Sequence, residues 1–246
     1  EGMVNDYDTD SFSSTTTASF SADMVLGAVS DGTSATNDGV GFDYGFQIDL
    51  NTSFTGEDSL DISIDAGNGN SSGVAEFDAN ATSDALKVDG ISYTFPLGKA
   101  TVIVGDNTDG SALFTTACAY GGPGNTLDDC GNVNAGITNG GAAVGASYDF
   151  GSGFTAAVGY AAGETDMGTG LMTKETLDAY GFNAAYSTDT YGVSLTYGLV
   201  ETSSVYEDTF TAINAYYAPE GFPSISVGYE VGEDGSVLDS ELDALT

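Results

Sequence analysis

The stretch FDYGFQIDLNTSF, residues 42–54, decides the fold class, because its apolar and polar side chains alternate without a break. Its even-numbered positions carry Phe, Tyr, Phe, Ile, Leu, Thr and Phe, whereas its odd-numbered positions carry Asp, Gly, Gln, Asp, Asn and Ser. A period of two residues is the period of a β-strand, whose successive side chains point to opposite faces. A tilted strand of roughly 9 to 11 residues crosses a bilayer, so this stretch is long enough to span a membrane.

The same alternation recurs along the chain and predicts about eleven strands in an all-β fold. Further alternating stretches lie at residues 18–28, 60–65, 91–97, 154–160, 191–199, 213–217 and 225–231. The tail is the exception, since Leu238, Leu242 and Leu245 fall at helical spacing. Three residues are a weak signal for a helix.

The links between these stretches differ in length. Short links rich in Gly, Asp or Pro lie at residues 151–153, 187–190 and 218–221. Long links lie at about residues 106–140, 162–176 and 200–208. Short turns at one rim and long loops at the other are typical of an antiparallel up-and-down transmembrane β-barrel.

Alternation alone does not say which face of the strands is covered. In a soluble sandwich the apolar face is buried, whereas in a membrane barrel it meets lipid and the polar face lines an aqueous lumen. The membrane interpretation is favoured by aromatic residues near strand ends, with Phe42 and Phe54 bracketing one strand and Phe182 and Tyr191 beginning two others. The apolar face also mixes Ala, Val, Leu and Tyr without evident complementarity of large and small side chains, which lipid tolerates.

The charge balance excludes several classes of protein. The 246 residues include 37 acidic side chains and only three cations, Lys87, Lys99 and Lys174, for a net charge of -34. Binding to nucleic acid requires cations that displace phosphate counterions, so it is excluded, as is membrane attachment through a basic patch. The chain has no His, which rules out Ser-His-Asp and Cys-His catalysis, and it carries neither a phosphate-binding loop motif nor a dinucleotide-binding motif. We therefore predict that it is not an enzyme.

The two cysteines, Cys118 and Cys130, flank a polar glycine-containing segment. A disulfide between them would suit an oxidising compartment, and two free thiols are the alternative. Two cysteines without His make a poor zinc site.

A calcium loop is suggested by Asp6, Asp8 and Asp10, but its sixth and twelfth positions hold Ser11 and Thr17 instead of Gly and Glu. We predict no cofactor and no dedicated metal site, with at most weak surface binding of Ca²⁺ or Mg²⁺.

Four stretches carry a family resemblance. They are DSFSSTTT at residues 10–17, IDLNTSFTGEDSL at 48–60, YTFPLG at 93–98 and YYAPEGFPSISVGY at 216–229. These stretches resemble the porins of cyanobacteria, especially marine ones, a family that is similar to the carbohydrate-selective porins and is often labelled "iron uptake porin". The resemblance extends in patches from about residue 10 to residue 232. An iron role has no support in ligand chemistry beyond generic carboxylates.

The resemblance implies a homotrimeric outer-membrane barrel of about sixteen strands, preceded by a surface-layer-homology domain and a coiled coil. We therefore interpret residues 1–246 as a single barrel domain that is a fragment, without the upstream domain and several C-terminal strands. Glu1 opens a polar acidic stretch and not a signal peptide, so we expect either that processing has removed one or that the chain is internal.

The leading functional hypothesis is a porin of the bacterial outer membrane through which small hydrophilic solutes, inorganic cations among them, diffuse passively. Acidic side chains on the polar face would line the lumen and favour cations. The predicted pore-lining residues are Asp23, Asp43, Asp49, Asp61, Asp65, Asp149 and Glu230. The loop between Cys118 and Cys130 either folds inward as the constriction, which we favour slightly, or lies outside.

The alternative hypothesis is a secreted or cell-surface structural or adhesive β-protein, such as a surface-layer or filament subunit. Its apolar face would be buried, and divalent cations would bridge its acidic faces.

Overall fold

The computed structural model is all-β. It describes residues 15–27, 40–69, 80, 82–119, 130–137, 141–163, 178–203, 206–235 and 241–245. Within these ranges no helix has the length and apolar character needed to cross a bilayer.

Twelve strands follow one another along the chain. They are β1 (Thr16–Gly27), β2 (Gly41–Thr52), β3 (Ser59–Gly67), β4 (Lys87–Leu97), β5 (Ala100–Thr108), β6 (Gly141–Gly151), β7 (Phe154–Ala162), β8 (Asp178–Ser187), β9 (Tyr191–Ser203), β10 (Tyr206–Tyr217), β11 (Ile225–Glu233) and β12 (Glu241–Leu245). Their order in the sheet is their order in the sequence, from β1 to β12. The chain is therefore an up-and-down sheet, as the alternating links predict, and it divides into two compact units, residues 1–74 with 79–93 and residues 75–78 with 94–246.

The first unit is built on the hairpins formed by β1, β2 and β3. Phe20 lies opposite Ile48, and Ile48 opposite Ile64, so the apolar side chains of the three strands share one face. The polar side chains share the other face, where Ser19 and Ser63 flank Asp49.

The short turn between β2 and β3 is organised by Asp58, which is buried. One oxygen of its carboxylate accepts hydrogen bonds from the backbone N–H and the hydroxyl of Thr55, at 2.7 Å each, and from the Ser53 hydroxyl at 2.9 Å. The other oxygen accepts from the Tyr93 hydroxyl at 2.6 Å. These donors, Tyr93 first and Thr55 next, favour the charged form and hold the pKa of the Asp58 carboxyl well below its usual range.

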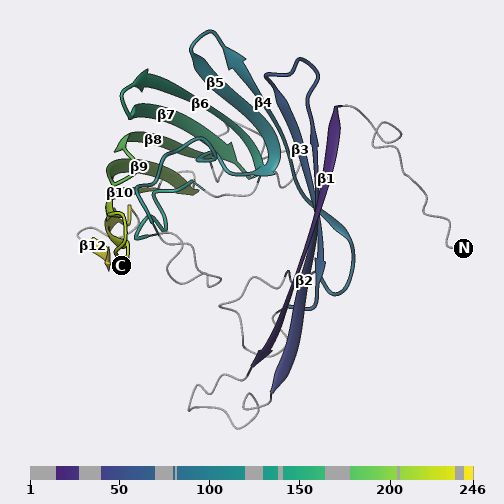
Figure 1. The fold of residues 1–246 in the computed structure, drawn as a ribbon. Coiled ribbons are helices and arrows are strands. Elements are labelled where there is room, and N and C mark those ends of the chain that lie inside the picture. The colour runs from purple at the N-terminus through teal and green to yellow at the C-terminus, as the bar shows by residue number, and fades with distance from the viewer. Residues whose placement is uncertain are drawn as a thin grey trace, which may run out of the picture. The chain divides into compact units, whose positions relative to one another are not determined.

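The second unit is a regular antiparallel array from β5 to β11, extended at its end by β12 (Figure 1). Short links join β4 to β5, β6 to β7, β8 to β9 and β10 to β11. The long link from Thr108 to Gly141 joins β5 to β6. The short and long links predicted at residues 151–153, 187–190, 218–221, 106–140 and 162–176 are found there.

Three details differ from the prediction. Residues 241–245 form strand β12 and not a helix, because they pair with the edge strand β11. The backbone hydrogen bonds of this pairing outweigh the weak helical signal from the spacing of three leucines. The long link expected at residues 200–208 is also wrong, since β9 extends to Ser203 and β10 begins at Tyr206, where the two strands are still paired. Phe182 lies within β8 and does not begin it.

Candidate functional site

The two faces of the second unit have opposite exposures. On β9 the apolar side chains Val193, Leu195 and Tyr197 are 50%, 43% and 41% exposed, while Ser194 and Thr196 between them are 3% and 0% exposed. A soluble sandwich shows the reverse pattern. The polar face is therefore the covered one, and this settles the question that alternation alone left open.

The polar face is covered by the connection between β5 and β6, of which residues 109–119 and 130–137 are described. These described residues are called the covering segment below. The first part of the covering segment crosses β8, β9 and β11 and bonds to one polar side chain on each. The Thr115 N–H donates to Asn183 Oδ1 at 2.9 Å, and the Asn183 amide returns a bond to the Thr115 carbonyl at 3.2 Å. The Ala117 N–H donates to Ser194 Oγ at 2.9 Å. Because the backbone amides are the donors, the polar side chains of the strands fix the path of this segment.

A third contact of this first part is on β11, where the Ala119 N–H donates to Ser226 Oγ at 2.7 Å. The returning part of the connection begins at Cys130, whose carbonyl accepts a hydrogen bond from the side chain of Asn214 on β10. Ala119 and Cys130, the described residues on either side of positions 120–129, thus bond to β11 and β10.

Glu230 on β11 is the strongest of these anchors. Its carboxylate is 2% exposed. The Asn134 N–H is shared between the two carboxylate oxygens, at 2.9 Å from Oε2 and 3.2 Å from Oε1. Oε1 also accepts from the Asn134 side chain at 2.7 Å, and Oε2 also accepts from the Ala135 N–H at 2.8 Å. Hydrogen bonds to a charged acceptor are roughly twice as strong as neutral ones, so this carboxylate pins residues 134–135 to the sheet.

Glycines on the polar face make room for the covering segment. A Cβ atom at Gly159 would overlap the Gly110 carbonyl, and one at Gly228 would overlap the Cys130 carbonyl. At Gly181 a Cβ would come within 2.7 Å of the Phe114 ring. Close backbone approach is a use that only glycine serves in a strand, so these residues and the segment fit one another.

The structure joins Cys118 to Cys130 by a disulfide, with the two Cα atoms 5.9 Å apart. The bond ties the outgoing part of the segment to the returning part. The described residues on both sides of the disulfide bond to side chains of the polar face, whereas residues 120–129, on which the choice between an inward and an external loop depends, lie outside the described residues.

The predicted pore-lining acids of the first unit lie on β1, β2 and β3. Asp23 is exposed, and Asp43 and Asp65 are buried. Asp49 and Asp61 are half-buried and belong to a ladder of polar side chains. The Ser63 hydroxyl donates to Asp49 at 2.7 Å, and Asn51 donates to Asp61 at 2.5 Å.

The remaining two predicted acids are in the second unit and differ from each other. Asp149 is exposed at the end of β6, where it accepts a bond from the Gly151 N–H at 2.7 Å and so caps the short turn. Glu230 is an anchor of the covering segment and is shielded from solvent.

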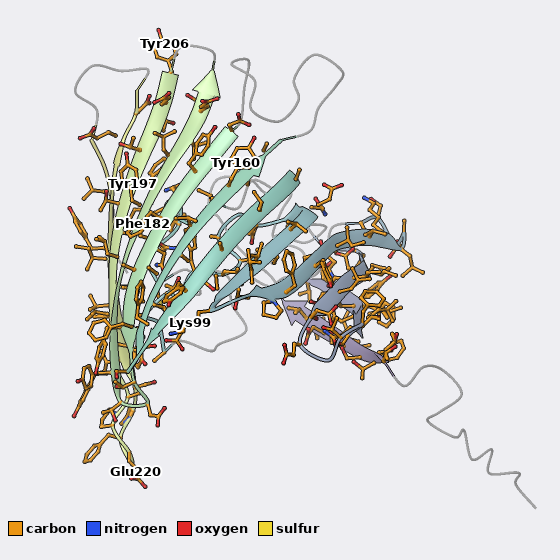
Figure 2. The ribbon with its side chains drawn as sticks, turned by 90° about the horizontal axis from the view of Figure 1, so that it is seen from above. Lys99, Tyr160, Phe182, Tyr197, Tyr206 and Glu220 are labelled. Atoms are coloured by element: carbon orange, nitrogen blue, oxygen red, sulfur yellow. A yellow bond between two sulfur atoms is a disulfide. The ribbon has the colours of Figure 1, made fainter. Side chains whose placement is uncertain are left out.

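Aromatic side chains gather at the short-turn end of the second unit. The rings of Phe154 and Tyr186 are 4.5 Å apart, and those of Tyr148 and Phe150 are 4.7 Å apart. Figure 2 shows Glu220, in the short link between β10 and β11, at the opposite end of the strands from Tyr206. Aromatic side chains at the ends of strands with an exposed apolar face are typical of the girdles of membrane barrels.

No group of three or more His, Cys, Asp or Glu side chains suited to a metal ion occurs in the part of the chain that the structure describes. The predicted calcium-like residues Asp6, Asp8 and Asp10 lie outside the described residues.

The chain is similar to solved structures of engineered variants of the Rhodopseudomonas blastica porin. One variant has a TM-score of 0.55 at 12% identity, with 93% of this chain and 78% of the porin covered. Another has a TM-score of 0.54 at 13% identity with the same coverage, and a third has 0.51 at 11% identity over 94% and 76% of the two chains. The chain has a porin fold. No protein-family model and no curated protein matches it.

Most of the residues that hold the covering segment could not be recognised from the sequence, because the prediction of lumen residues considered acidic side chains alone. Asn183, Ser194, Asn214 and Ser226 are uncharged, and a search for lumen carboxylates passes over them. Asp178 was also missed; it is 1% exposed and accepts a bond from the Tyr160 hydroxyl at 2.8 Å. The sequence did hold a signal for these residues. Asn183 alternates in step with Gly181 on β8, and Ser226 alternates in step with Gly228 on β11, so each polar side chain shares its face with a glycine that lies under the covering segment.

Proposed function

We propose that this chain forms a porin of the bacterial outer membrane, a passive channel for small hydrophilic solutes and not an enzyme. The observation that carries the proposal is the reversed exposure of the two faces: large apolar side chains are exposed and small polar ones are covered. An exposed apolar face on a sheet of this size requires a non-aqueous surrounding, which a bilayer supplies. The likeness to a bacterial porin supports the same assignment.

We propose further that the described parts of the connection between β5 and β6, residues 109–119 and 130–137, narrow the channel. A porin lumen is lined by the polar face of the strands. A segment that rests on that face through Asn183, Ser194 and Glu230 therefore lies within the lumen and reduces its cross-section.

The channel is proposed to prefer cations. The net charge of -34 and the ladder of Asp49 and Asp61 support this preference, since fixed negative charges along a pore raise the local concentration of cations and repel anions. Asp23, Asp43, Asp65 and Asp149 remain proposed lumen residues, whereas the charge of Glu230 is assigned to holding the segment.

The type of porin and its assembly are proposed from the sequence resemblance alone. We propose that the chain is the barrel domain of a cyanobacterial porin similar to the carbohydrate-selective porins. We further propose that it assembles as a homotrimer in the outer membrane and needs no cofactor.

The test is single-channel conductance in a planar bilayer under a salt gradient. Stepwise insertion with a reversal potential of the sign set by cations is the expected result. A protein that stays soluble without detergent and does not insert would overturn the proposal and favour the structural or adhesive β-protein.

A further inference from the structure

We propose that the channel favours small organic cations that carry an apolar portion, and that Val133 on the covering segment is a residue that sets this preference. The inference rests on the proposed function, because it takes the covering segment to lie in the lumen of a cation-preferring channel. It adds the chemical class of the solute, which the porin fold leaves open.

The covering segment has two different sides. On the side toward the strands, Ala135 and Ile137 are buried, and a Cβ atom at Gly198 on β9 would lie only 3.0 Å from the Ala135 backbone. Val133, two residues before Ala135, is 46% exposed, and Ala112 is exposed as well. These two side chains therefore lie on the side turned away from the strands, which is the side that a solute in the lumen meets.

The two exposed side chains belong to the same part of the surface. A Cβ atom at Gly136 would lie 3.2 Å from the side-chain nitrogen of Asn132 and 3.8 Å from Ser111 Oγ. Ser111 and Asn132 thus come together at Gly136, and Ala112 and Val133 directly follow them in the chain. We call Ala112 and Val133 the apolar patch.

The buried carboxylate beneath the covering segment does not offer its charge to solutes. Glu230 is shielded from solvent, and both of its oxygens accept hydrogen bonds from Asn134, the residue after Val133. The described residues at 110–119 and 130–137 are themselves all uncharged. A solute that passes this described surface therefore meets apolar side chains in place of a fixed charge.

The acids of the polar face and the apolar patch impose two different requirements. Acids such as Asp49 and Asp61 concentrate cations. An apolar side chain supplies no ligand to a hydrated ion, whereas its contact with a hydrocarbon group removes apolar surface of both from water and is favourable. A cation with a short apolar portion meets both requirements, while an inorganic cation meets only the first.

The experiment compares two probes, propylammonium and 2-hydroxyethylammonium, in a planar bilayer. The probes have the same charge and nearly the same size, and they differ by a terminal methyl group in place of a hydroxyl group. With the chloride salt of one probe on each side, the reversal potential gives their permeability ratio. We expect the wild type to favour propylammonium about twofold, because contact with one or two side chains removes the methyl group only partly from water.

The role of Val133 is tested with two substitutions at this exposed position. Val133→Asn removes the apolar side chain at similar size and should abolish the preference, whereas Val133→Leu keeps an apolar side chain and should retain it. The matched control is Val40→Asn, at an exposed valine directly before β2, and it should keep the wild-type ratio.

Each of three results would overturn the proposal. They are equal permeability of the two probes in the wild type, an unchanged preference in Val133→Asn, and a loss of preference in Val133→Leu or Val40→Asn as large as that in Val133→Asn. The same recordings separate this inference from the proposed function. Channels that do not distinguish the probes would refute the apolar patch alone, and the absence of channels in the wild type would refute the porin.

Discussion

Removal of the Glu230 carboxylate tests how the covering segment is held. In the wild type this buried side chain accepts three donors, the Asn134 N–H, the Asn134 side chain and the Ala135 N–H, at distances of 2.7 to 3.2 Å. In Glu230→Ala all three donors lose their acceptor. We expect residues 130–137 to leave the polar face more often, while the strands remain paired.

The size of the effect follows from opposing contributions. A hydrogen bond to a charged group contributes about 1.5 to 3 kcal/mol, so the three bonds together are worth several kcal/mol. The substitution also removes the free energy that burial of a carboxylate costs, and an open segment regains hydrogen bonds to water. We therefore expect a net change of about 2 kcal/mol in the opening equilibrium, which is roughly thirtyfold.

The assay is amide hydrogen exchange of the protein in detergent, read at Asn134 and Ala135, with single-channel recording beside it. Exchange at these two amides should accelerate roughly thirtyfold, and the open-channel current should become noisier or larger. Glu233→Ala, on the same strand but exposed, is the control and should change neither readout. Unchanged exchange in Glu230→Ala, with the amides of β9 still protected, would refute the idea that Glu230 pins the segment.

Three further predictions follow from the same structure. Replacement of Asp49 and Asp61 by Asn should lower cation selectivity, seen as a reversal potential closer to zero under a salt gradient. Because Asp58 has a depressed pKa in the folded state, its stabilising contribution is present above its unfolded pKa of about 4 and is lost as the pH falls toward the folded value. The difference in unfolding free energy between wild type and Asp58→Asn should accordingly be constant from about pH 5 to 7 and shrink below about pH 4. Gly228→Ala should displace the Cys130 carbonyl and destabilise the closed segment by about 1 to 3 kcal/mol, measured as faster exchange at residues 130–137.

Local chemistry made much of the fold predictable. The alternation in residues 42–52 lies in β2, and the turn residues at 152–153 and 218–221 lie in the short links on which the register of their hairpins depends. Where the sequence failed, a tertiary interaction outweighed a weak local pattern. Residues 241–245 pair with β11, β9 runs on to Ser203, and β10 begins already at Tyr206, where a long loop was expected.

The sequence by itself determined that this chain is an acidic, all-β protein with two chemically different faces, because side-chain periodicity and composition are properties of the chain. Only the tertiary structure decided which face is covered, since an alternating strand is equally compatible with a buried or an exposed apolar face. It also decided what the acids do. Asp49 and Glu230 are alike in sequence, yet Asp49 belongs to a half-buried polar ladder and Glu230 is enclosed by the backbone of a segment about 95 positions away in the chain.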